Sequence, residues 1–373
     1  MGRIEQHAVS IEDYQLNHPL IVACAKPPML LPSESMEALN RPRAPRRQLN
    51  AMKAIQFKEV GGPDVMQLVD IPKPELRPRM VRVRNHAVGI NFADNFFRQG
   101  TYQIRAKPPD TPGMEGAGVI DEVGPDVEGF KPGMRVAGIG LKAYAEYSLF
   151  YANQLIPLPD FVSFEEGAAF PIQTLTAWFM LHKSHQVSAG QTVIVHSAAG
   201  GVGIVASQLA KAAGAQVIGT VSSNAKFDIA KQYGADHVIN YETHDFADEA
   251  MKITGGKGVD LVLDAVGKPT FEKALKCMAP FGHIILYGRA GGPPDKLETG
   301  KLFANAVKVS GFVLLTASSQ HDLMKRGVED CFRLMGEGKL KMLIGKSFPL
   351  AEAPAAHRFM ESRQSVGKLI LTP

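Results

Sequence analysis

The stretch Gln191-Thr-Val-Ile-Val-His-Ser-Ala-Ala-Gly-Gly-Val-Gly203 decides the fold. A run of apolar and β-branched residues ends in small residues, and an alanine-rich amphipathic segment follows from Ile204 to Ala213. This order predicts a strand, a tight turn and a helix. The turn has the spacing Ala-x-Gly-x-x-Gly, a variant of the dinucleotide-binding fingerprint, although a glycine-rich turn without a ligand is the alternative.

Small residues in this turn would let the backbone approach a pyrophosphate. The N-terminus of the following helix would attract its negative charge through free N–H groups and the helix dipole. The residues expected to hold a pyrophosphate are Ala198, Ala199, Gly200, Gly201, Val202 and Gly203.

The composition is that of an ordinary globular protein, with 373 residues, 45% hydrophobic residues and a net charge of +4. This length predicts two domains, and so mild a charge does not require a nucleic-acid or membrane-surface role. Three distant cysteines without a Cys-x-x-Cys pair argue against a disulfide framework and a sulfur-ligated zinc site. No apolar run reaches the roughly 18 residues of a membrane span, and no signal-peptide pattern opens the chain. We therefore expect a cytoplasmic protein.

Residues 1–51 differ from the rest of the chain, because they are rich in proline and have no sustained hydrophobic period. They are predicted to form a disordered extension, with a short helix possible at Glu34–Leu39. The arginine cluster at positions 41–47 could be a targeting or nucleic-acid patch, but a solvated tail is the favoured interpretation. Met52 is the natural start of the folded part.

The folded part changes character near Thr174. Up to Phe170, short strands separated by Gly and Pro predict a β-rich, barrel-like unit that contains one helix, Asn91–Gln99. Beyond Thr174, alternating strands and helices predict a doubly wound parallel sheet, that is, an α/β fold. The predicted strands are Met52–Phe57, Met80–His86, Ala117–Val123, Arg135–Ile139, Ala143–Phe150, Gln191–Ser197, Gln216–Val221, His237–Asn240, Asp260–Val266, His283–Tyr287, Ala306–Leu315 and Lys368–Leu371. The other predicted helices are Thr174–Ser184, Val202–Ala213, Asn224–Tyr233, Asp245–Ile253, Thr270–Met278, Asp322–Met335 and Pro354–Ser362.

The segment Thr220-Val-Ser-Ser-Asn-Ala-Lys226 indicates which nicotinamide cofactor would bind. An NAD site needs an acidic residue about 20 positions after the glycines, to bond the ribose 2′-hydroxyl. Here the first acid is Asp228, already inside the next predicted helix. The hydroxyls of Ser222 and Ser223 and the cation of Lys226 would instead suit a 2′-phosphate. NADPH is therefore favoured over NADH, although Lys226 alone could equally be a solvated helix residue.

Five motifs give the chain from Met52 to Pro373 a family resemblance. They are residues 89–102 (Gly-Ile-Asn-Phe-Ala-Asp-Asn-Phe-Phe-Arg-Gln-Gly-Thr-Tyr), 112–118 (Pro-Gly-Met-Glu-Gly-Ala-Gly), 196–203, 234–241 (Gly-Ala-Asp-His-Val-Ile-Asn-Tyr) and 258–267 (Gly-Val-Asp-Leu-Val-Leu-Asp-Ala-Val-Gly). The chain resembles the zinc-free quinone oxidoreductases, the zeta-crystallin-like branch of the medium-chain dehydrogenase/reductase superfamily. The resemblance implies a GroES-like catalytic domain, residues 52–174 and 312–373, around a Rossmann NADP-binding domain, residues 175–311. It also implies a homodimer paired through an edge strand at Val307–Leu315.

The resemblance assigns roles to individual residues. Asn91 should lie at the nicotinamide, and Tyr102 nearby should donate a hydrogen bond or a proton, or else be a packing residue. Phe96 lacks the hydroxyl that a tyrosine often offers at this position in bacterial members of the family. The remaining positions along the cofactor are Lys226 and Tyr241 at the adenosine phosphate, and Val266, Gly267, Tyr287 and Gly288 at strand ends, where ordinary turns are the alternative.

The zinc ligands of the related alcohol dehydrogenases are missing, since this chain has Asn91 in place of a Cys and Met114 in place of a His. A catalytic zinc needs about three protein ligands, so we expect no metal, and Glu115 is expected to make a structural hydrogen bond. His196 is expected to be satisfied by backbone hydrogen bonds rather than to touch a substrate.

Without a Lewis acid, the substrate must accept a hydride readily, as a quinone or a conjugated alkene does. The sequence thus predicts an NADPH-dependent quinone reductase with a small-molecule substrate and no membrane partner. Two alternatives remain: an enal or enoyl reductase, and a cofactor-holding structural or RNA-binding protein, although nucleic acid is an unlikely partner.

Overall fold

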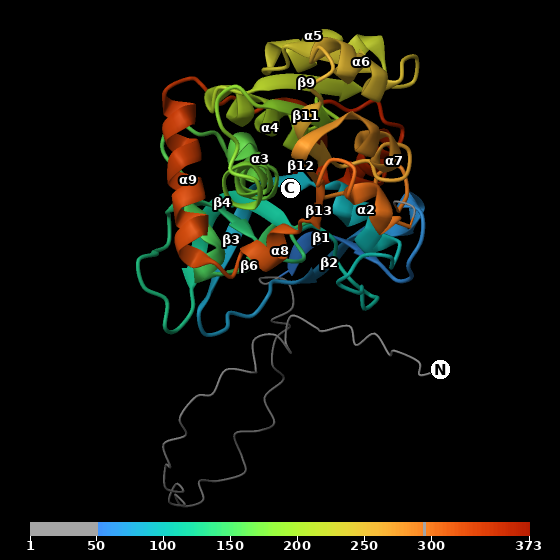
Figure 1. The fold of residues 1–373 in the computed structure, drawn as a ribbon. Helices are drawn as coiled ribbons and strands as arrows, with labels where there is room; N and C mark the ends of the chain where they lie inside the picture. The colour runs from blue at the N-terminus through green and yellow to red at the C-terminus, as the bar shows by residue number, and fades with distance from the viewer. Residues whose placement is uncertain (1–50, 294–295) are drawn as a thin grey trace, which may run out of the picture.

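The computed structural model describes residues 51–293 and 296–373, so the predicted extension and its helix at Glu34–Leu39 lie outside the described residues. Two large sheets form the body of the protein, with helix α3, Phe164–Phe179, between them (Figure 1). The strands between residues 80 and 157, coloured cyan to green, belong to one sheet, and the middle of the chain, coloured green to orange, forms the other. This mixed architecture confirms the predicted α/β fold class.

The first sheet has six parallel strands in the order β10-β9-β8-β11-β12-β13. Their bounds are β8 Thr192–His196, β9 Gln216–Val221, β10 His237–Asn240, β11 Val259–Asp264, β12 Met278–Leu286 and β13 Lys308–Gly311. The strand order reverses at β8, and in open parallel sheets a ligand crevice lies outside the carboxyl ends of the strands at such a point. The β8 residues Val193, Ile194 and Val195 are fully buried, as expected for a strand covered on both faces.

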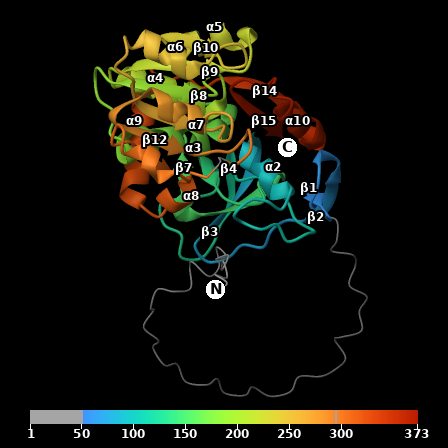
Figure 2. The ribbon, with the colours of Figure 1, turned by 45° about the vertical axis from the view of Figure 1, so that its right-hand side comes forward.

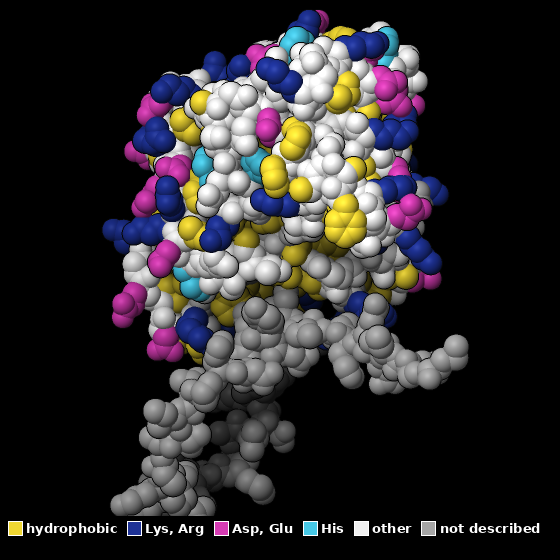
Figure 3. Space-filling view, viewed as in Figure 1, with side chains coloured by type: hydrophobic (Ala, Val, Ile, Leu, Met, Phe, Trp, Pro, Cys, Tyr) yellow, Lys and Arg dark blue, Asp and Glu magenta, His cyan; other side chains and the backbone are white. Residues whose placement is uncertain are grey.

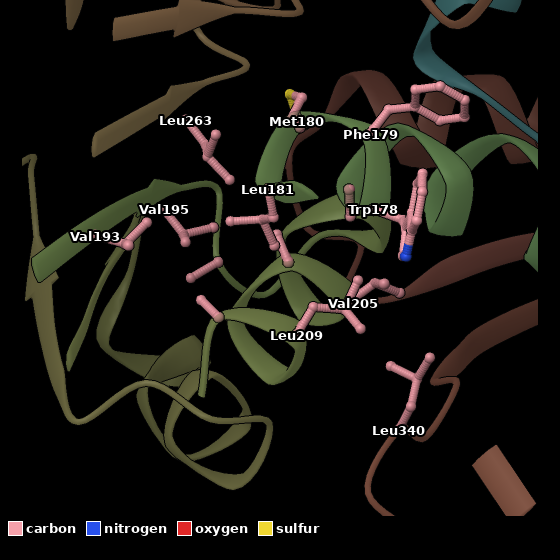
Figure 4. Close-up of a cluster of buried hydrophobic side chains, with 14 of the residues drawn as sticks. Trp178, Phe179, Met180, Leu181, Val193, Val195, Val205, Leu209, Leu263 and Leu340 are labelled. Atoms are coloured by element: carbon pink, nitrogen blue, oxygen red, sulfur yellow. The ribbon is translucent and has the colours of Figure 1, made fainter. Parts of the chain in front are cut away.

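Helices cover both faces of this sheet. They are α4 Gly201–Ala212, α5 Phe227–Gln232, α6 Phe246–Ile253, α7 Phe271–Ala274, α8 Leu314–Ala317 and α9 His321–Gly336. Figure 4 shows one side of the core, where Val193 and Val195 of β8 pack with Val205 and Leu209 of α4 and with Leu181. This packing fixes the glycine turn between β8 and α4.

The second sheet has the order β14-β15-β3-β4-β5-β7, and β6 also pairs with β3. Their bounds are β3 Met80–Ile90, β4 Glu115–Val123, β5 Arg135–Ile139, β6 Tyr147–Tyr151, β7 Leu155–Pro157, β14 Ile344–Pro349 and β15 Lys368–Thr372. β1 Ala51–Phe57 and β2 Met66–Pro72 form a separate antiparallel pair, and the helices of this part are α2 Phe92–Arg98 and α10 Ala353–Glu361. β15 pairs with β3, which confirms that the last strand returns to the first part of the chain. Figure 2 shows β14, β15 and α10 in red beside the blue strands β1 and β2.

Helix α3, Phe164–Phe179, contacts β3, β4 and β5 of the second sheet and helix α4, which covers the parallel sheet. It begins at a capping box, in which the Ser163 hydroxyl accepts from the Glu166 N–H at 3.1 Å and the Glu166 carboxylate accepts from the Ser163 N–H at 3.0 Å. The helix continues into a π-helical turn, Met180–Ser184. The proposed division between residues 174 and 175 falls inside this helix.

Several predicted elements are shorter or shifted. The helix predicted at Thr174–Ser184 begins at Phe164, and the helix predicted at Thr270–Met278 is α7 followed by a 3-10 turn. The strand predicted at Ala306–Leu315 covers only β13, because Ala306 has φ +51°, outside the strand region, and residues from Leu314 are helical. Short 3-10 helices complete the structure at Pro63–Val65, Ala152–Gln154, Asn224–Lys226, Leu275–Cys277, Thr299–Leu302 and Leu350–Glu352.

Candidate functional site

The glycine turn lies at the carboxyl end of β8, at the point where the strand order reverses. Gly200 is the N-cap of α4, and the first-turn N–H groups of Gly201, Val202 and Gly203 have no acceptor within the helix. A Cβ on Gly203 would overlap the Ser197 carbonyl oxygen, so this position requires glycine. The structure thus brings the six predicted residues into one turn with donors suited to an anion.

His196, the last residue of β8, is fully buried. Its Nδ1 lies 2.7 Å from the Thr220 hydroxyl on β9, and its ring packs edge-on against Phe246 at 4.7 Å. Burial lowers the pKa of His196, so the ring is neutral near pH 7. The expectation of backbone hydrogen bonds was wrong in detail, since the partner is a side chain, but the role that follows is structural.

The predicted 2′-phosphate residues Ser222, Ser223 and Lys226 line a pocket of about 440 Å³ beyond the end of β9. The pocket is completed by Ala225, Glu242, Ser362, Arg363, Gln364 and Val366. The Lys226 ammonium donates to the carbonyls of Arg363 at 2.6 Å and Ser365 at 3.0 Å, and burial lowers its pKa. Glu242 is exposed to solvent at the rim.

Arg363 is a residue that the sequence analysis missed. It brings a second cation to this pocket from the segment between α10 and β15, which is far from Lys226 in the sequence. The same segment reaches the glycine turn, where the Gly367 N–H donates to the Ala199 carbonyl at 2.8 Å. Tyr241 follows β10, hydrogen-bonds Ser222 and has a pKa raised by burial, so its hydroxyl stays protonated.

The predicted residues at the ends of β11 and β12 also come together. The Asp264 carboxylate accepts from the N–H groups of Val266 at 2.8 Å and Gly267 at 3.0 Å, so these donors are occupied by the turn itself. A Cβ on Gly288 would lie 2.6 Å from the Ala265 carbonyl oxygen, which shows how closely the two strand ends approach. Tyr287 is the first residue after β12, and burial raises the pKa of its hydroxyl.

The half-buried Asn91 forms a triad with the buried side chains of Glu115 and Lys368. The Asn91 amide donates to Glu115 Oε1 at 2.8 Å, and the Lys368 ammonium donates to Asn91 Oδ1 at 2.7 Å and to Glu115 Oε1 at 2.5 Å. Glu115 is fully buried and also accepts from the Ile172 N–H at 2.7 Å. The structural hydrogen bond expected for Glu115 is therefore confirmed, and Lys368 is a partner that no local sequence signal indicated.

A second buried network starts three residues later, at Asp94. Its Oδ2 accepts from the Asn91 N–H at 2.8 Å and from the Tyr144 hydroxyl at 3.2 Å. The Tyr144 oxygen lies 2.9 Å from His357 Nε2, and Arg98 Nη1 lies 2.9 Å from His357 Nδ1. Since a guanidinium only donates, Nδ1 is the acceptor and Nε2 carries the proton toward Tyr144. Burial raises the pKa of Asp94 to about 7, and burial together with Arg98 lowers that of His357 to about 3.

Tyr102 is half-buried after α2 and packs against the apolar cluster of Phe57, Phe97 and Met114. Burial raises the pKa of the Tyr102 hydroxyl, which therefore remains a proton carrier at neutral pH. Met114 lies inside this cluster, so its side chain is a packing group.

Across the described ranges 51–293 and 296–373, no three His, Cys, Asp or Glu residues are grouped so that they could hold a metal ion. A search of these ranges for a helix with the length and hydropathy of a membrane span also finds none.

Comparisons with known proteins agree with this geometry. The family "Alcohol dehydrogenase GroES-like domain" matches residues 77–160, and "Zinc-binding dehydrogenase" matches residues 201–329. A quinone oxidoreductase of Pseudomonas aeruginosa is 38% identical, and a 2-haloacrylate reductase of a Burkholderia species is 37% identical. Each match covers 86% of this chain and 99% of the relative.

A solved structure supports the same family assignment. The Escherichia coli quinone oxidoreductase, crystallised in complex with NADPH, superposes with a TM-score of 0.83 at 34% identity, over 86% of this chain and all of that one. The glycine turn, the two sheets and these matches lead to one conclusion: the chain belongs to the quinone oxidoreductases of the medium-chain dehydrogenase/reductase superfamily.

Proposed function

We propose that this chain transfers a hydride from NADPH to a quinone without the help of a metal ion. The quinone gains the hydride and one proton from solvent or from a protein donor, and leaves as a hydroquinone, while NADPH becomes NADP⁺. The observation that carries this proposal is the pocket beyond β9, where Ser222, Ser223, Lys226 and Arg363 meet next to the glycine turn. Hydroxyls and cations together are the groups that bind a phosphate.

The residues of the chain divide the work in this proposal. Bound NADPH would supply the hydride, and the glycine turn and the pocket beyond β9 would hold its phosphates. Asn91, fixed by Glu115 and Lys368, would orient the nicotinamide or the acceptor. Tyr102 would donate a hydrogen bond or a proton to the reduced oxygen. The remaining cofactor contacts are assigned to Tyr241, Val266, Gly267, Tyr287 and Gly288.

The test is NADPH oxidation with a panel of benzoquinones and naphthoquinones, compared with NADH, together with metal analysis of the active enzyme. We expect quinone-dependent oxidation that prefers NADPH and withstands chelators. Tight NADPH binding with no turnover of any quinone would contradict the proposal. A stoichiometric zinc ion whose removal abolishes turnover would contradict the metal-free step.

A second candidate function is reduction of a conjugated alkene. It is favoured by the 2-haloacrylate reductase, whose substrate by name carries a carbon–carbon double bond next to a carboxylate. Turnover of 1,4-naphthoquinone against an α,β-unsaturated aldehyde separates the two functions, because a clear preference for the aldehyde would reverse their order.

The third alternative, a structural or RNA-binding role, has less support. On the face drawn in Figure 3, lysines and arginines are interspersed with aspartates and glutamates, rather than gathered into a basic patch. Non-specific nucleic-acid binding depends on such a patch, because phosphate contacts supply most of its affinity.

We also propose a homodimer and a cytoplasmic location. β13 pairs only with β12 among the described strands, which leaves an open edge for a second copy. Phe281 and Phe303, near this edge, are 71% and 85% exposed. Sedimentation at micromolar concentration should give twice the chain mass. The two domains that we propose are the catalytic domain, residues 52–174 with 312–373, and the NADP-binding domain, residues 175–311.

A further inference from the structure

Arg289 connects the two parts of the molecule beside the proposed active site. It follows Tyr287 and Gly288 at the end of β12 and reaches the loop after α2. Its Nη2 donates to the Thr101 carbonyl at 2.5 Å, and its guanidinium carbon lies 4.6 Å from the centre of the Phe96 ring. The guanidinium therefore contacts Thr101, the residue directly before the proposed donor Tyr102.

The backbone on both sides of this contact is held firmly. Next to Arg289, the Ala290 N–H donates to the Ala265 carbonyl at 3.1 Å, and Gly288 packs on the same residue. On the other side, the N–H groups of Thr101 and Tyr102 both donate to the Phe96 carbonyl, at 2.9 and 3.1 Å. The Arg289 guanidinium is thus a cation held at a defined place.

Among the described residues, the contacts of Arg289 include no carboxylate partner. In the described part of the chain, the guanidinium makes no salt bridge. Its central carbon lies over the Phe96 ring and one N–H donor goes to a neutral carbonyl, while a guanidinium has five N–H donors. The remaining edge can bind both oxygens of a planar anion such as a carboxylate.

We propose that Arg289 is a specificity residue that selects acceptors carrying a carboxylate or sulfonate next to the electrophilic double bond. The inference rests on the proposed function, because it concerns the acceptor of that same hydride. Phe96 contributes by holding the guanidinium through a cation–π contact, for which a ring without a hydroxyl is sufficient.

The test compares 1,4-naphthoquinone-2-sulfonate with uncharged 1,4-naphthoquinone. In Arg289→Gln, we expect kcat/KM for the sulfonate to fall about 10-fold or more, mainly through KM, and that for the neutral quinone to change less than about 3-fold. Arg289→Lys should retain part of the preference, because it keeps the charge but loses the planar fork. Arg326→Gln, an exposed arginine on α9, is the matched control and should affect neither acceptor.

Equal losses for both quinones would overturn the inference and make Arg289 a latch between the two parts of the chain. Unchanged kinetics for both would overturn it as well. A binding measurement keeps the inference separate from the proposed function: calorimetry with 2-naphthalenesulfonate, which cannot be reduced, on the NADPH-loaded protein. If no quinone is turned over, weaker binding in Arg289→Gln still supports the anion site, and equal binding refutes it.

Discussion

The glycine turn and the Asn91 triad are built in opposite ways. The turn takes its six residues, Ala198–Gly203, from one contiguous stretch that follows β8 and runs into the first turn of α4. The triad joins Asn91, Glu115 and Lys368 from the start of α2, the start of β4 and the start of β15. Backbone groups and small residues make the first site, whereas buried charges make the second. The comparison teaches that a site for an anion can be encoded locally, while a site that fixes a polar side chain needs the complete fold.

The largest effect is expected for Lys368→Met, which leaves the Glu115 carboxylate buried without its cation. We expect the free energy of unfolding to fall by about 3–5 kcal/mol, because an unpaired buried charge is not solvated. Urea denaturation measures this. Lys301→Met, which breaks two exposed salt bridges, should cost far less, because solvent screens both pairs. A loss as small as that in Lys368→Met would mean that the triad does not hold this side of the site together.

The second prediction concerns the pH dependence of stability through Asp94, whose Oδ1 is buried without a partner. Its pKa is raised to about 7 in the folded protein, against an ordinary value near 3.8. The folded state therefore binds the proton more tightly, and this contribution is complete below about pH 4 and is lost as the pH rises to about 7. The loss is at most about 4 kcal/mol.

Asp94→Asn removes this titration while keeping the shape of the side chain. Its free energy of unfolding should decline less than that of the wild type between pH 4 and 7, as measured by denaturation at a series of pH values. Parallel curves for the two proteins would show that Asp94 does not titrate in this range.

Gly203→Ala tests whether this position of the turn tolerates any residue with a Cβ atom. The new Cβ would overlap the Ser197 carbonyl oxygen, so the turn must shift. We expect the free energy of unfolding to fall by about 1–3 kcal/mol and NADPH binding to weaken. Gly300→Ala is the control, because nothing lies within 4 Å of its Cβ position. Thermal melts and NADPH titration of the two variants should differ clearly; similar results would make the turn more tolerant than proposed.

The smallest effect is expected at the pocket beyond β9. This pocket combines residues of one local stretch, such as Lys226, with Arg363 from a distant segment. Lys226→Asp should weaken NADPH binding about 10-fold and NADH binding less, because only NADPH carries the 2′-phosphate. Lys231→Asp, an exposed residue of α5, makes the same charge change away from the pocket. Fluorescence titration of both cofactors decides the matter, and equal effects on the two cofactors would remove Lys226 from the phosphate site.

Much of the fold could be predicted from local pattern. The strands β5, β9 and β10 have the predicted bounds, since each is a short apolar run that closely follows a glycine, Gly133, Gly214 or Gly234. The strand predicted at Ala306–Leu315 was too long, because apolar residues at 312–315 read the same in a strand and in a helix. The glycine turn was predictable residue by residue, since its spacing is itself the geometric requirement.

The partners of the site residues could not be predicted. The sequence alone determined a parallel sheet with a glycine turn at the start of a helix, because periodicity and small residues act over a few positions. Only the tertiary structure decided that Lys368 would hold Asn91, that Arg363 would join Lys226, and that Arg289 would lie on Phe96. These pairs come from segments that meet when β15 returns to β3 and when the two sheets pack around α3. The residues next to a side chain in the sequence do not specify which distant cation or carboxylate will contact it in the folded protein.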